Sequence, residues 1–194
     1  VIKLAPLVIA ARSRPDEFDT FVVTTGQHRE MLQQMLGVFQ IAVDFDLDIM
    51  KPAQDLRYIT TAALDGLHEV IGQVKPDWVV VQGDTTTTLA GGLAAFYQQV
   101  PVAHVEAGLR TYDKRHPFPE EMNRRLTTQI ADAHFAPTTL ARERLLREGV
   151  SEEDIWTTGN TGIDALFLVL GSRAGETPPK LAGERRLLLT AHRR

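Results

Sequence analysis

Residues 79–91, VVVQGDTTTTLAG, and residues 102–124, VAHVEAGLRTYDKRHPFPEEMNR, decide the fold expected of this chain. Each stretch begins with a β-branched hydrophobic strand that runs into an acidic residue, Asp84 in the first and Glu106 in the second. A third acid, Glu120, follows within the second stretch. In an open α/β sheet, ligands bind beyond the carboxyl ends of the strands. Several acids at that edge therefore indicate proton chemistry on a bound substrate.

Helix and strand patterns alternate along almost the whole chain, which is typical of a parallel sheet with helices on both faces. We therefore expect an α/β fold with a Rossmann-like, doubly wound parallel sheet. The expected helices are 2–13, 28–39, 56–74, 86–99, 120–131, 139–148 and a last one that ends near residue 170. The expected strands are 21–24, 78–82, 102–105, 134–136 and 155–158, while residues 42–53 look irregular.

Three regions are expected along the chain. Residues 1–170 form the Rossmann-like domain, and residues 171–185, rich in Gly, Pro and charge, suit a linker. Residues 186–194 look like the start of a second, truncated domain, because they contain another short strand pattern. No strand precedes the first helix, although helices of this architecture normally follow one. The sheet is therefore expected to lack its first strand, and both ends of the chain look interrupted.

Composition limits the functional classes. The net charge of −4 and the pI of about 5.9 argue against a nucleic-acid or anionic-membrane partner. No apolar run approaches the roughly 18 residues of a membrane span, and no signal peptide is apparent. Cysteine is absent, which excludes thiolate catalysis and fits a reducing compartment. We therefore expect a cytoplasmic protein.

Each acid also has an ordinary structural interpretation. Asp84 could cap the helix that follows it, because Asp is a preferred N-cap residue. Glu120 and Glu121 could simply favour the positive end of a helix dipole. Glu106 is harder to explain structurally, because a carboxylate at the tip of a buried strand is seldom left unpaired.

Several basic residues could act with these acids. Arg124 lies one helical turn past Glu120, which suits either a surface ion pair or an anchor for the acid and a phosphate. Arg110 could hold an anionic ligand in the same way. His192 follows the last strand pattern and, with two arginines beside it, suits a diphosphate. Three further histidines are expected near the same edge of the sheet: His28, His104 and His116. No spacing resembles a metal site, so no metal is assigned.

Seven short motifs, taken together, indicate a resemblance to a known family that none of them indicates alone. In order along the chain stand IKLAPL, TTGQHREML, QGDTTTT, HVEAGLRT, PFPEEMNR, TGNTGIDAL and TAHRR. Together they resemble the bacterial non-hydrolysing UDP-N-acetylglucosamine 2-epimerases, and HVEAGLRT followed by PEE-x-NR is highly specific. The resemblance implies one half of a two-domain fold of the glycosyltransferase-B type, with the active site in the cleft between the halves.

The resemblance also assigns roles to individual residues. It implies that Asp84, Glu106 and Glu120 are the acidic catalytic residues and that His192 is the active-site histidine. Lys3 and Arg124 match residues close to the nucleotide-sugar. The family's N-terminal strand, its GTRPE loop and most of its C-terminal domain are not found in the sequence.

Some members of the family bind a second UDP-N-acetylglucosamine as an activator. Gln27 and Gln54 match positions used for that purpose, whereas Glu30 and Ala53 depart from the expected pattern. Activation of this protein is therefore left open.

The implied reaction is reversible inversion at C2 of UDP-N-acetylglucosamine, by elimination and return of UDP, for cell-surface polysaccharide precursors. It calls for acids on two faces of the sugar ring and for no cofactor. The resemblance also implies a homodimer. The alternatives are a glycosyltransferase-B-type UDP-sugar transferase, a hydrolysing epimerase, and an inactive fragment that only binds nucleotide or dimerises. The segment by itself is expected to be inactive.

Overall fold

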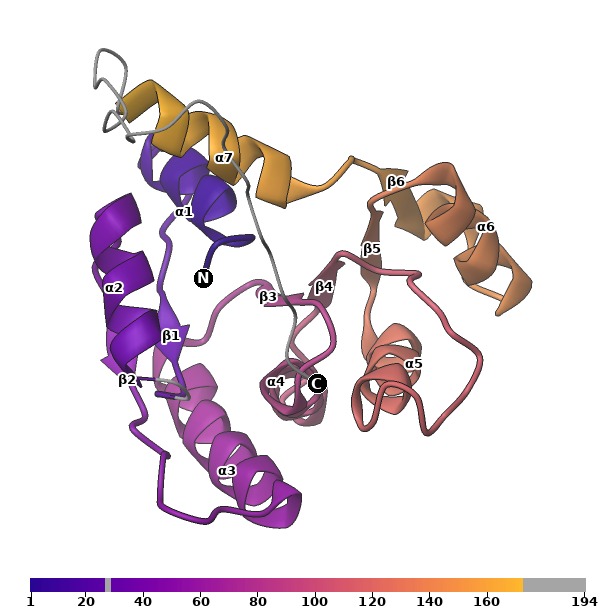
Figure 1. The fold of residues 1–194 in the computed structure, drawn as a ribbon, viewed down its shortest axis with the longest axis horizontal. Helices are drawn as coiled ribbons and strands as arrows, with labels where there is room; N and C mark the ends of the chain where they lie inside the picture. Colours follow the sequence, from indigo (N-terminus) through magenta and orange to yellow (C-terminus); the bar gives the residue numbers. More distant parts are fainter. Residues whose placement is uncertain (27–28, 173–194) are drawn as a thin grey trace, which may run out of the picture.

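Parallel strands form two separate sheets in the computed structural model, which describes residues 1–26 and 29–172. A two-stranded sheet pairs β1 with β2, and a four-stranded sheet has the order β3-β4-β5-β6 (Figure 1). The strands are β1 (Val23–Thr24), β2 (Phe45–Asp46), β3 (Val79–Gln82), β4 (Val102–Val105), β5 (Ala133–Ala136) and β6 (Ile155–Thr157).

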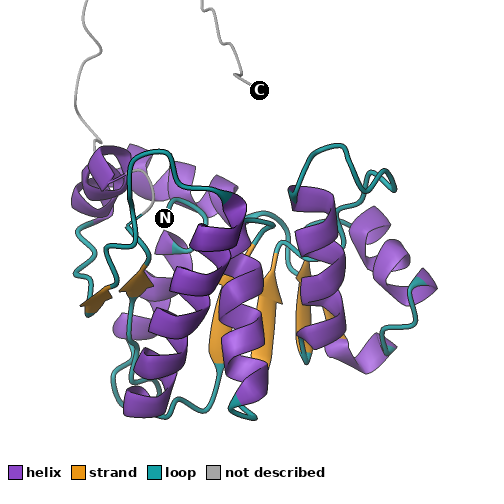
Figure 2. Ribbon diagram, turned by 90° about the horizontal axis from the view of Figure 1, so that it is seen from below, coloured by secondary structure: helices purple, strands orange, loops and turns teal. Residues whose placement is uncertain are grey.

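Helices connect these strands along the chain. They are α1 (Ala5–Arg12), α2 (Arg29–Phe39), α3 (Leu56–Val74), α4 (Thr86–Tyr97), α5 (Glu120–Ile130), α6 (Thr139–Arg147) and α7 (Thr161–Ser172), with a short 3₁₀ helix at Glu152–Asp154. The crossovers through α4, α5 and α6 all advance in one direction across the sheet, and right-handed connections therefore place these helices on one face. Figure 2 shows helices lying in front of the strands. Residues of α1, α2 and α7 share a separate apolar cluster.

The alternation of helix and strand is confirmed. The long helix at 56–74 and the strand at 102–105 have the expected bounds. Several expectations were wrong in detail; for example, the strand expected at 21–24 is confined to Val23–Thr24. The first helix runs over Ala5–Arg12 rather than 2–13, and residues 42–53 contain the short strand β2. Of the linker expected at 171–185, residues 171–172 belong to α7. The rest of the linker and the start of a second domain lie outside the described residues, so the domain boundaries stay a prediction.

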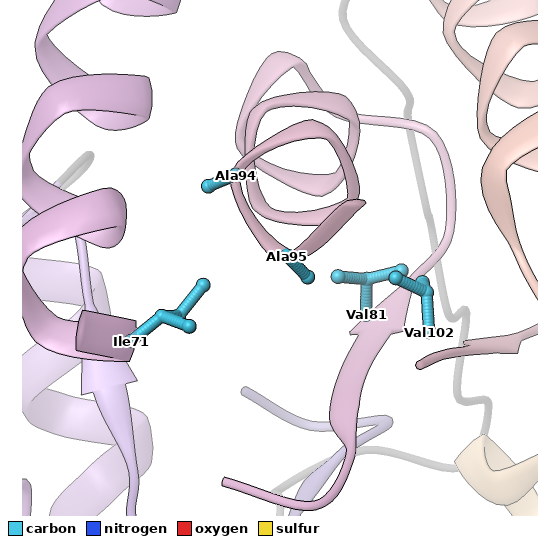
Figure 3. Packing of buried hydrophobic residues seen from close by; sticks show 5 residues of the cluster. All are labelled: Ile71, Val81, Ala94, Ala95 and Val102. Carbon is cyan, nitrogen blue, oxygen red and sulfur yellow. The ribbon is translucent and has the colours of Figure 1, made fainter. Parts of the chain in front are cut away.

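Alanine and glycine residues let α4 pack closely against the sheet. Figure 3 shows Ala95 pointing toward Val81 of β3 and Val102 of β4, while Ile71 approaches α4 from α3. A Cβ atom at Gly91 would lie 3.2 Å from a methyl carbon of Val81, which is tighter than most real contacts. The small residues of α4 therefore fix the height of this helix above β3, whose carboxyl end leads into Asp84.

The edges of β1 and β3 that do not face β2 and β4 have no strand partner among the described residues. Within residues 1–26 and 29–172, no helix is both long enough and apolar enough to cross a bilayer.

Candidate active site

The carboxyl ends of β3 and β4 place two of the expected acids on adjacent turns. Gly83 and Asp84 follow β3, and Glu106 follows β4 directly. Both turns use left-handed backbone, with φ of +75° at Gly83 and +65° at Glu106. This conformation is unfavourable for a residue with a side chain, so the surrounding structure must hold Glu106 in it.

Glu106 is held by three side chains from distant parts of the sequence. Lys3, in the turn before α1, forms an ion pair with Oε1 of Glu106. The amide nitrogen of Gln82 donates to Oε2 at 2.6 Å, and that of Asn160 lies 3.4 Å from Oε1. The Glu106 side chain is 12% exposed. This carboxylate is therefore oriented, charge-paired and still reachable from solvent.

Asp84 is tied to the first turn of α5. Nη2 of Arg124 lies 2.5 Å from Oδ2 of Asp84, and Nδ2 of Asn123 donates to the Asp84 carbonyl oxygen at 2.9 Å. The Asp84 side chain is 28% exposed. Thr85, and not Asp84, accepts the capping hydrogen bond at the start of α4. The N-cap interpretation of Asp84 was therefore wrong.

Glu120 and Glu121, the first two residues of α5, differ in their hydrogen bonds. Glu121 is fully buried, and its carboxylate accepts hydrogen bonds from the backbone of Thr111 at 3.0 Å and Tyr112 at 3.1 Å. It therefore fixes the loop between β4 and α5. Oε2 of Glu120 is also buried, yet it has no hydrogen-bond partner among the described residues. A buried carboxylate oxygen without a partner is costly, which favours a role for Glu120 toward a ligand.

Arg124 forms ion pairs with two carboxylates, those of Asp84 and Glu121. Its Nη1 lies 3.4 Å from Oε2 of Glu121, while its Nη2 holds Asp84. The expected partner of Arg124 was Glu120, but the structure places the guanidinium against Asp84 and Glu121 instead. The guanidinium fork can reach two carboxylates because its donors point in fixed, divergent directions.

Two other basic candidates are paired with acidic residues outside the three expected acids. The buried Arg110 binds both carboxylate oxygens of Glu148 at 2.8 Å and donates to Thr128 at 2.7 Å, which leaves no free face for an anion. The ligand role considered for Arg110 was wrong. His116 is exposed and lies 3.0 Å from Asp113.

His104 lies in the core and not at the open edge of the sheet. Its Nε2 atom is 2.8 Å from the carbonyl oxygen of Gly83. Burial lowers the pKa of His104 to about 4, so the imidazole is neutral at physiological pH.

Four expected residues lie outside this constellation. His192 and Gln27 fall outside the described residues, as does His28. Gln54 lies in the loop before α3, where its side-chain oxygen accepts a hydrogen bond from the Lys51 backbone. Across the described ranges, no group of three His, Cys, Asp or Glu side chains could hold a metal ion.

Sequence reasoning missed three amides that organise the site, namely Gln82, Asn123 and Asn160. All three lie in motifs already singled out, QGDTTTT, PFPEEMNR and TGNTGIDAL. Two of these amides lie close to acidic residues in their motifs, and the third lies in a glycine-containing turn. These positions could have indicated that the amides contact the acids.

The fold and the clustered acids define a class of protein: a Rossmann-like α/β domain of the glycosyltransferase-B type with acids at the carboxyl edge of its sheet. The particular family follows from the sequence comparison. The family model for UDP-N-acetylglucosamine 2-epimerase matches residues 10–194. The chain therefore belongs to the UDP-N-acetylglucosamine 2-epimerase family.

Curated relatives and solved structures agree with this assignment. The UDP-N-acetylglucosamine 2-epimerase of Bacillus subtilis is 54% identical over 196 residues, which cover 100% of this chain and 51% of that protein. The Neisseria meningitidis enzyme, solved with UDP-GlcNAc bound, has a TM-score of 0.85 and 48% identity, covering 90% of this chain and 47% of the solved chain. The Methanocaldococcus jannaschii enzyme, solved with UDP-GlcNAc and UDP, has a TM-score of 0.83 and 37% identity, covering 90% and 48%.

The chain spans about half the length of the curated relatives it matches. The matched part corresponds to their N-terminal portion.

Proposed function

We propose that the full-length protein containing this chain interconverts UDP-N-acetylglucosamine and UDP-N-acetylmannosamine without hydrolysing either. The observation that supports the proposal is that Asp84 and Glu106 follow the adjacent strands β3 and β4. Glu120 opens α5, the helix that contacts the Asp84 turn through Asn123 and Arg124. Asp84 and Glu106 are each oriented by a cation and an amide, and Glu120 keeps a buried oxygen without a partner in the described part of the chain.

The chemistry explains why acids are needed and a redox cofactor is not. The C2 proton of the sugar is not adjacent to a carbonyl and is too weakly acidic for direct removal. As the C1–O bond breaks, its electron pair leaves with UDP and C1 gains oxocarbenium character, which acidifies the C2 proton. A base removes that proton, giving 2-acetamidoglucal and UDP. Return of UDP to C1, with a proton delivered to the opposite face of C2, gives the manno epimer.

The proposed roles follow from the arrangement of the acids. Glu106 and Asp84 handle the proton on the two faces of the ring, since inversion requires an acid and a base that approach from opposite sides. Glu120 stabilises the positive charge at C1 or shares the proton transfer. His192 supports the leaving diphosphate. Lys3 and Arg124 hold Glu106 and Asp84 in place and lie beside the nucleotide-sugar.

The wider setting is proposed on the same basis. The substrate site is completed by a second domain that begins within residues 186–194. The enzyme acts in the cytoplasm as a homodimer and requires no metal or organic cofactor. Its product serves the synthesis of cell-surface polysaccharides. Gln27 and Gln54 are candidate contacts for a second UDP-N-acetylglucosamine that activates the enzyme.

Proton NMR of the full-length protein with UDP-N-acetylglucosamine in deuterium oxide tests the proposal. The expected result is UDP-N-acetylmannosamine that carries deuterium at C2, with UDP retained. Release of free N-acetylmannosamine and UDP would establish the hydrolysing reaction instead. Binding of the nucleotide-sugar without exchange at C2 would favour a transferase or a domain that only binds.

A further inference from the structure

Two successive carbonyl groups in the turn that carries Asp84 are held by side chains from other elements. His104 Nε2 lies 2.8 Å from the Gly83 carbonyl oxygen, and Asn123 Nδ2 lies 2.9 Å from the Asp84 carbonyl oxygen. Both side chains are buried, and the imidazole of His104 is fully enclosed. These two contacts involve only the backbone of the turn, so they do not engage the Asp84 carboxylate, which Arg124 holds.

The same two residues stand close in sequence to the other acids. His104 lies in β4, two residues before Glu106, and Asn123 lies in the first turn of α5, three residues after Glu120. The Gly83 amide also donates to the Val105 carbonyl oxygen at 3.0 Å. The hydrogen bonds of His104 and Asn123 therefore connect the Asp84 turn to the element that carries each of the other two acids.

We propose that His104 and Asn123 are positioning residues that set the spacing of Asp84 relative to Glu106 and Glu120. The inference rests on the proposed epimerisation, in which proton transfer must reach both faces of one ring carbon. It assigns a role in catalysis to two buried side chains that do not contact the substrate.

The backbone of the turn shows why such a restraint is needed. Gly83 has a φ of +75°, a region that glycine enters readily and can leave readily. Without the donors from His104 and Asn123, the peptide groups on either side of Asp84 are freer to rotate, and the carboxylate moves with them. A displacement of about 1 Å in a reacting group can reduce the rate by about 10²-fold.

The protonation of His104 suits this role. The pKa of the imidazole is lowered to about 4, chiefly by burial, so the ring remains neutral during catalysis. A neutral imidazole has one N–H group, and the contact with a carbonyl oxygen places the proton on Nε2. Nδ1, which then carries no proton, has no hydrogen-bond partner in the described part of the chain.

The chain offers a matched control in His134. It is the cross-strand neighbour of His104 in β5, it is 2% exposed, and burial lowers its pKa as well. Among the described contacts, His134 makes no hydrogen bond to a turn that carries one of the three acids. Thr127 offers the same control for Asn123, because it is fully buried on α5 and its hydroxyl has no partner in the described ranges.

The test compares four variants of the full-length enzyme: His104→Met, His104→Gln, His104→Asn and His134→Met. Gln can place an amide N–H near the position of Nε2, whereas the shorter Asn cannot reach it. We expect His104→Met and His104→Asn to lower kcat on the order of 10- to 100-fold with little change in KM. His104→Gln should recover most of that loss, and His134→Met should leave kcat within about twofold of wild type.

Equal losses of kcat in His104→Met and His134→Met would overturn the proposal, because they would indicate a general effect of core substitution. So would a His104→Gln variant no better than His104→Asn. If His104→Met does not fold, the Gln and Asn variants still decide the matter. Asn123→Leu against Thr127→Val provides the second comparison, with a loss of kcat expected only in the first.

Nitrogen-15 NMR of the imidazoles in the wild-type protein separates failure of this inference from failure of the proposed function. An Nε2-protonated, hydrogen-bonded His104 in an enzyme that does not epimerise would leave the restraint intact and reject the reaction. An active enzyme in which His104 lacks this Nε2 proton would reject the restraint and leave the reaction intact.

Discussion

The Arg124 guanidinium lies 2.5 Å from the Asp84 carboxylate and joins the first turn of α5 to the turn after β3. Because Arg124 also reaches the fully buried Glu121, which holds the loop between β4 and α5, it connects three segments around the candidate site. The contact orients Asp84 and also places a positive charge beside the acids, where a departing diphosphate would need one.

Replacing Arg124 should therefore affect catalysis more than folding. We expect Arg124→Met to lower kcat/KM by about 10²-fold or more, because Asp84 loses its orienting partner and the site loses a cation. Arg124→Lys should restore only part of the rate, since an ammonium cannot reach both carboxylates in the way a guanidinium fork can. Steady-state kinetics of the full-length enzyme provide the measurement. Arg125→Met, which changes the exposed neighbouring arginine, is the control, and equal effects of the two Met variants would refute the assignment.

Glu106→Gln should almost abolish turnover while preserving the fold. The amide keeps the shape of the side chain but can neither accept the C2 proton nor balance the charge of Lys3. General acid–base groups contribute about 10²- to 10⁴-fold, and a loss in that range is expected. Exchange of the C2 proton with deuterium oxide should fall in parallel. Glu152→Gln, on the exposed Arg142 ion pair, serves as the matched control. Turnover close to wild type in Glu106→Gln would exclude the proton-transfer role.

Local sequence signals predicted the acids of the site but not the groups that orient them. Asp84 and Glu106 were identified because each lies just past the end of a β-branched hydrophobic strand, and that end marks the ligand edge of a parallel sheet. The partner of Glu106 is Lys3, 103 positions away, and no local pattern connects the two. Only the tertiary structure, which brings the turn before α1 beside the residue that follows β4, joins them.

Arg110 and Arg124 also show that local sequence signals do not identify the partners of a side chain. In the sequence, Arg110 and Arg124 both flank acidic motifs and are equally plausible ligands for an anion. In the structure, Arg110 is paired with Glu148, which lies at the C-terminal end of α6, whereas Arg124 is paired with Asp84 at the carboxyl edge of the sheet.

The short strand β2 was missed because two residues within an acidic stretch are too few to show the alternation of a strand.

Glycine substitutions should distinguish backbone strain from steric contact in this domain. Gly108 and Gly149 both have a left-handed φ, +85° and +88°. A Cβ atom at Gly108 would lie 2.3 Å from the backbone oxygen of Ala141 in α6, whereas one at Gly149 would meet nothing within 4 Å. We expect Gly149→Ala to lower the free energy of unfolding by about 1 kcal/mol. Gly108→Ala should cost about 3 kcal/mol or more, because backbone cannot move aside cheaply. Urea unfolding measures both, and equal losses would show that α6 does not lie so close to Gly108.

Stability should decrease in mild acid because of the buried histidines. The pKa of His104 is lowered from 6.5 to about 4 in the folded protein, mainly by burial, and that of His134 is lowered for the same reason. Between the unfolded-state pKa of His104, 6.5, and its folded-state pKa, about 4, the unfolded chain binds more protons than the folded chain. The free energy of unfolding therefore falls as the pH falls through this range. The contribution of His104 to this loss is roughly 3 kcal/mol by about pH 4.

Urea unfolding of wild type and His104→Gln across that pH range isolates the contribution of His104, because the carboxylates titrate in both proteins. The variant should be less sensitive to acid, and its free energy of unfolding should approach or exceed that of wild type toward the low end of the range. The steeper pH dependence should persist in His134→Met, which retains His104. Parallel curves for wild type and His104→Gln would mean that the pKa of the His104 imidazole is the same in the folded protein as in the unfolded chain. Burial would then not lower the pKa of His104, and the stability prediction would fail.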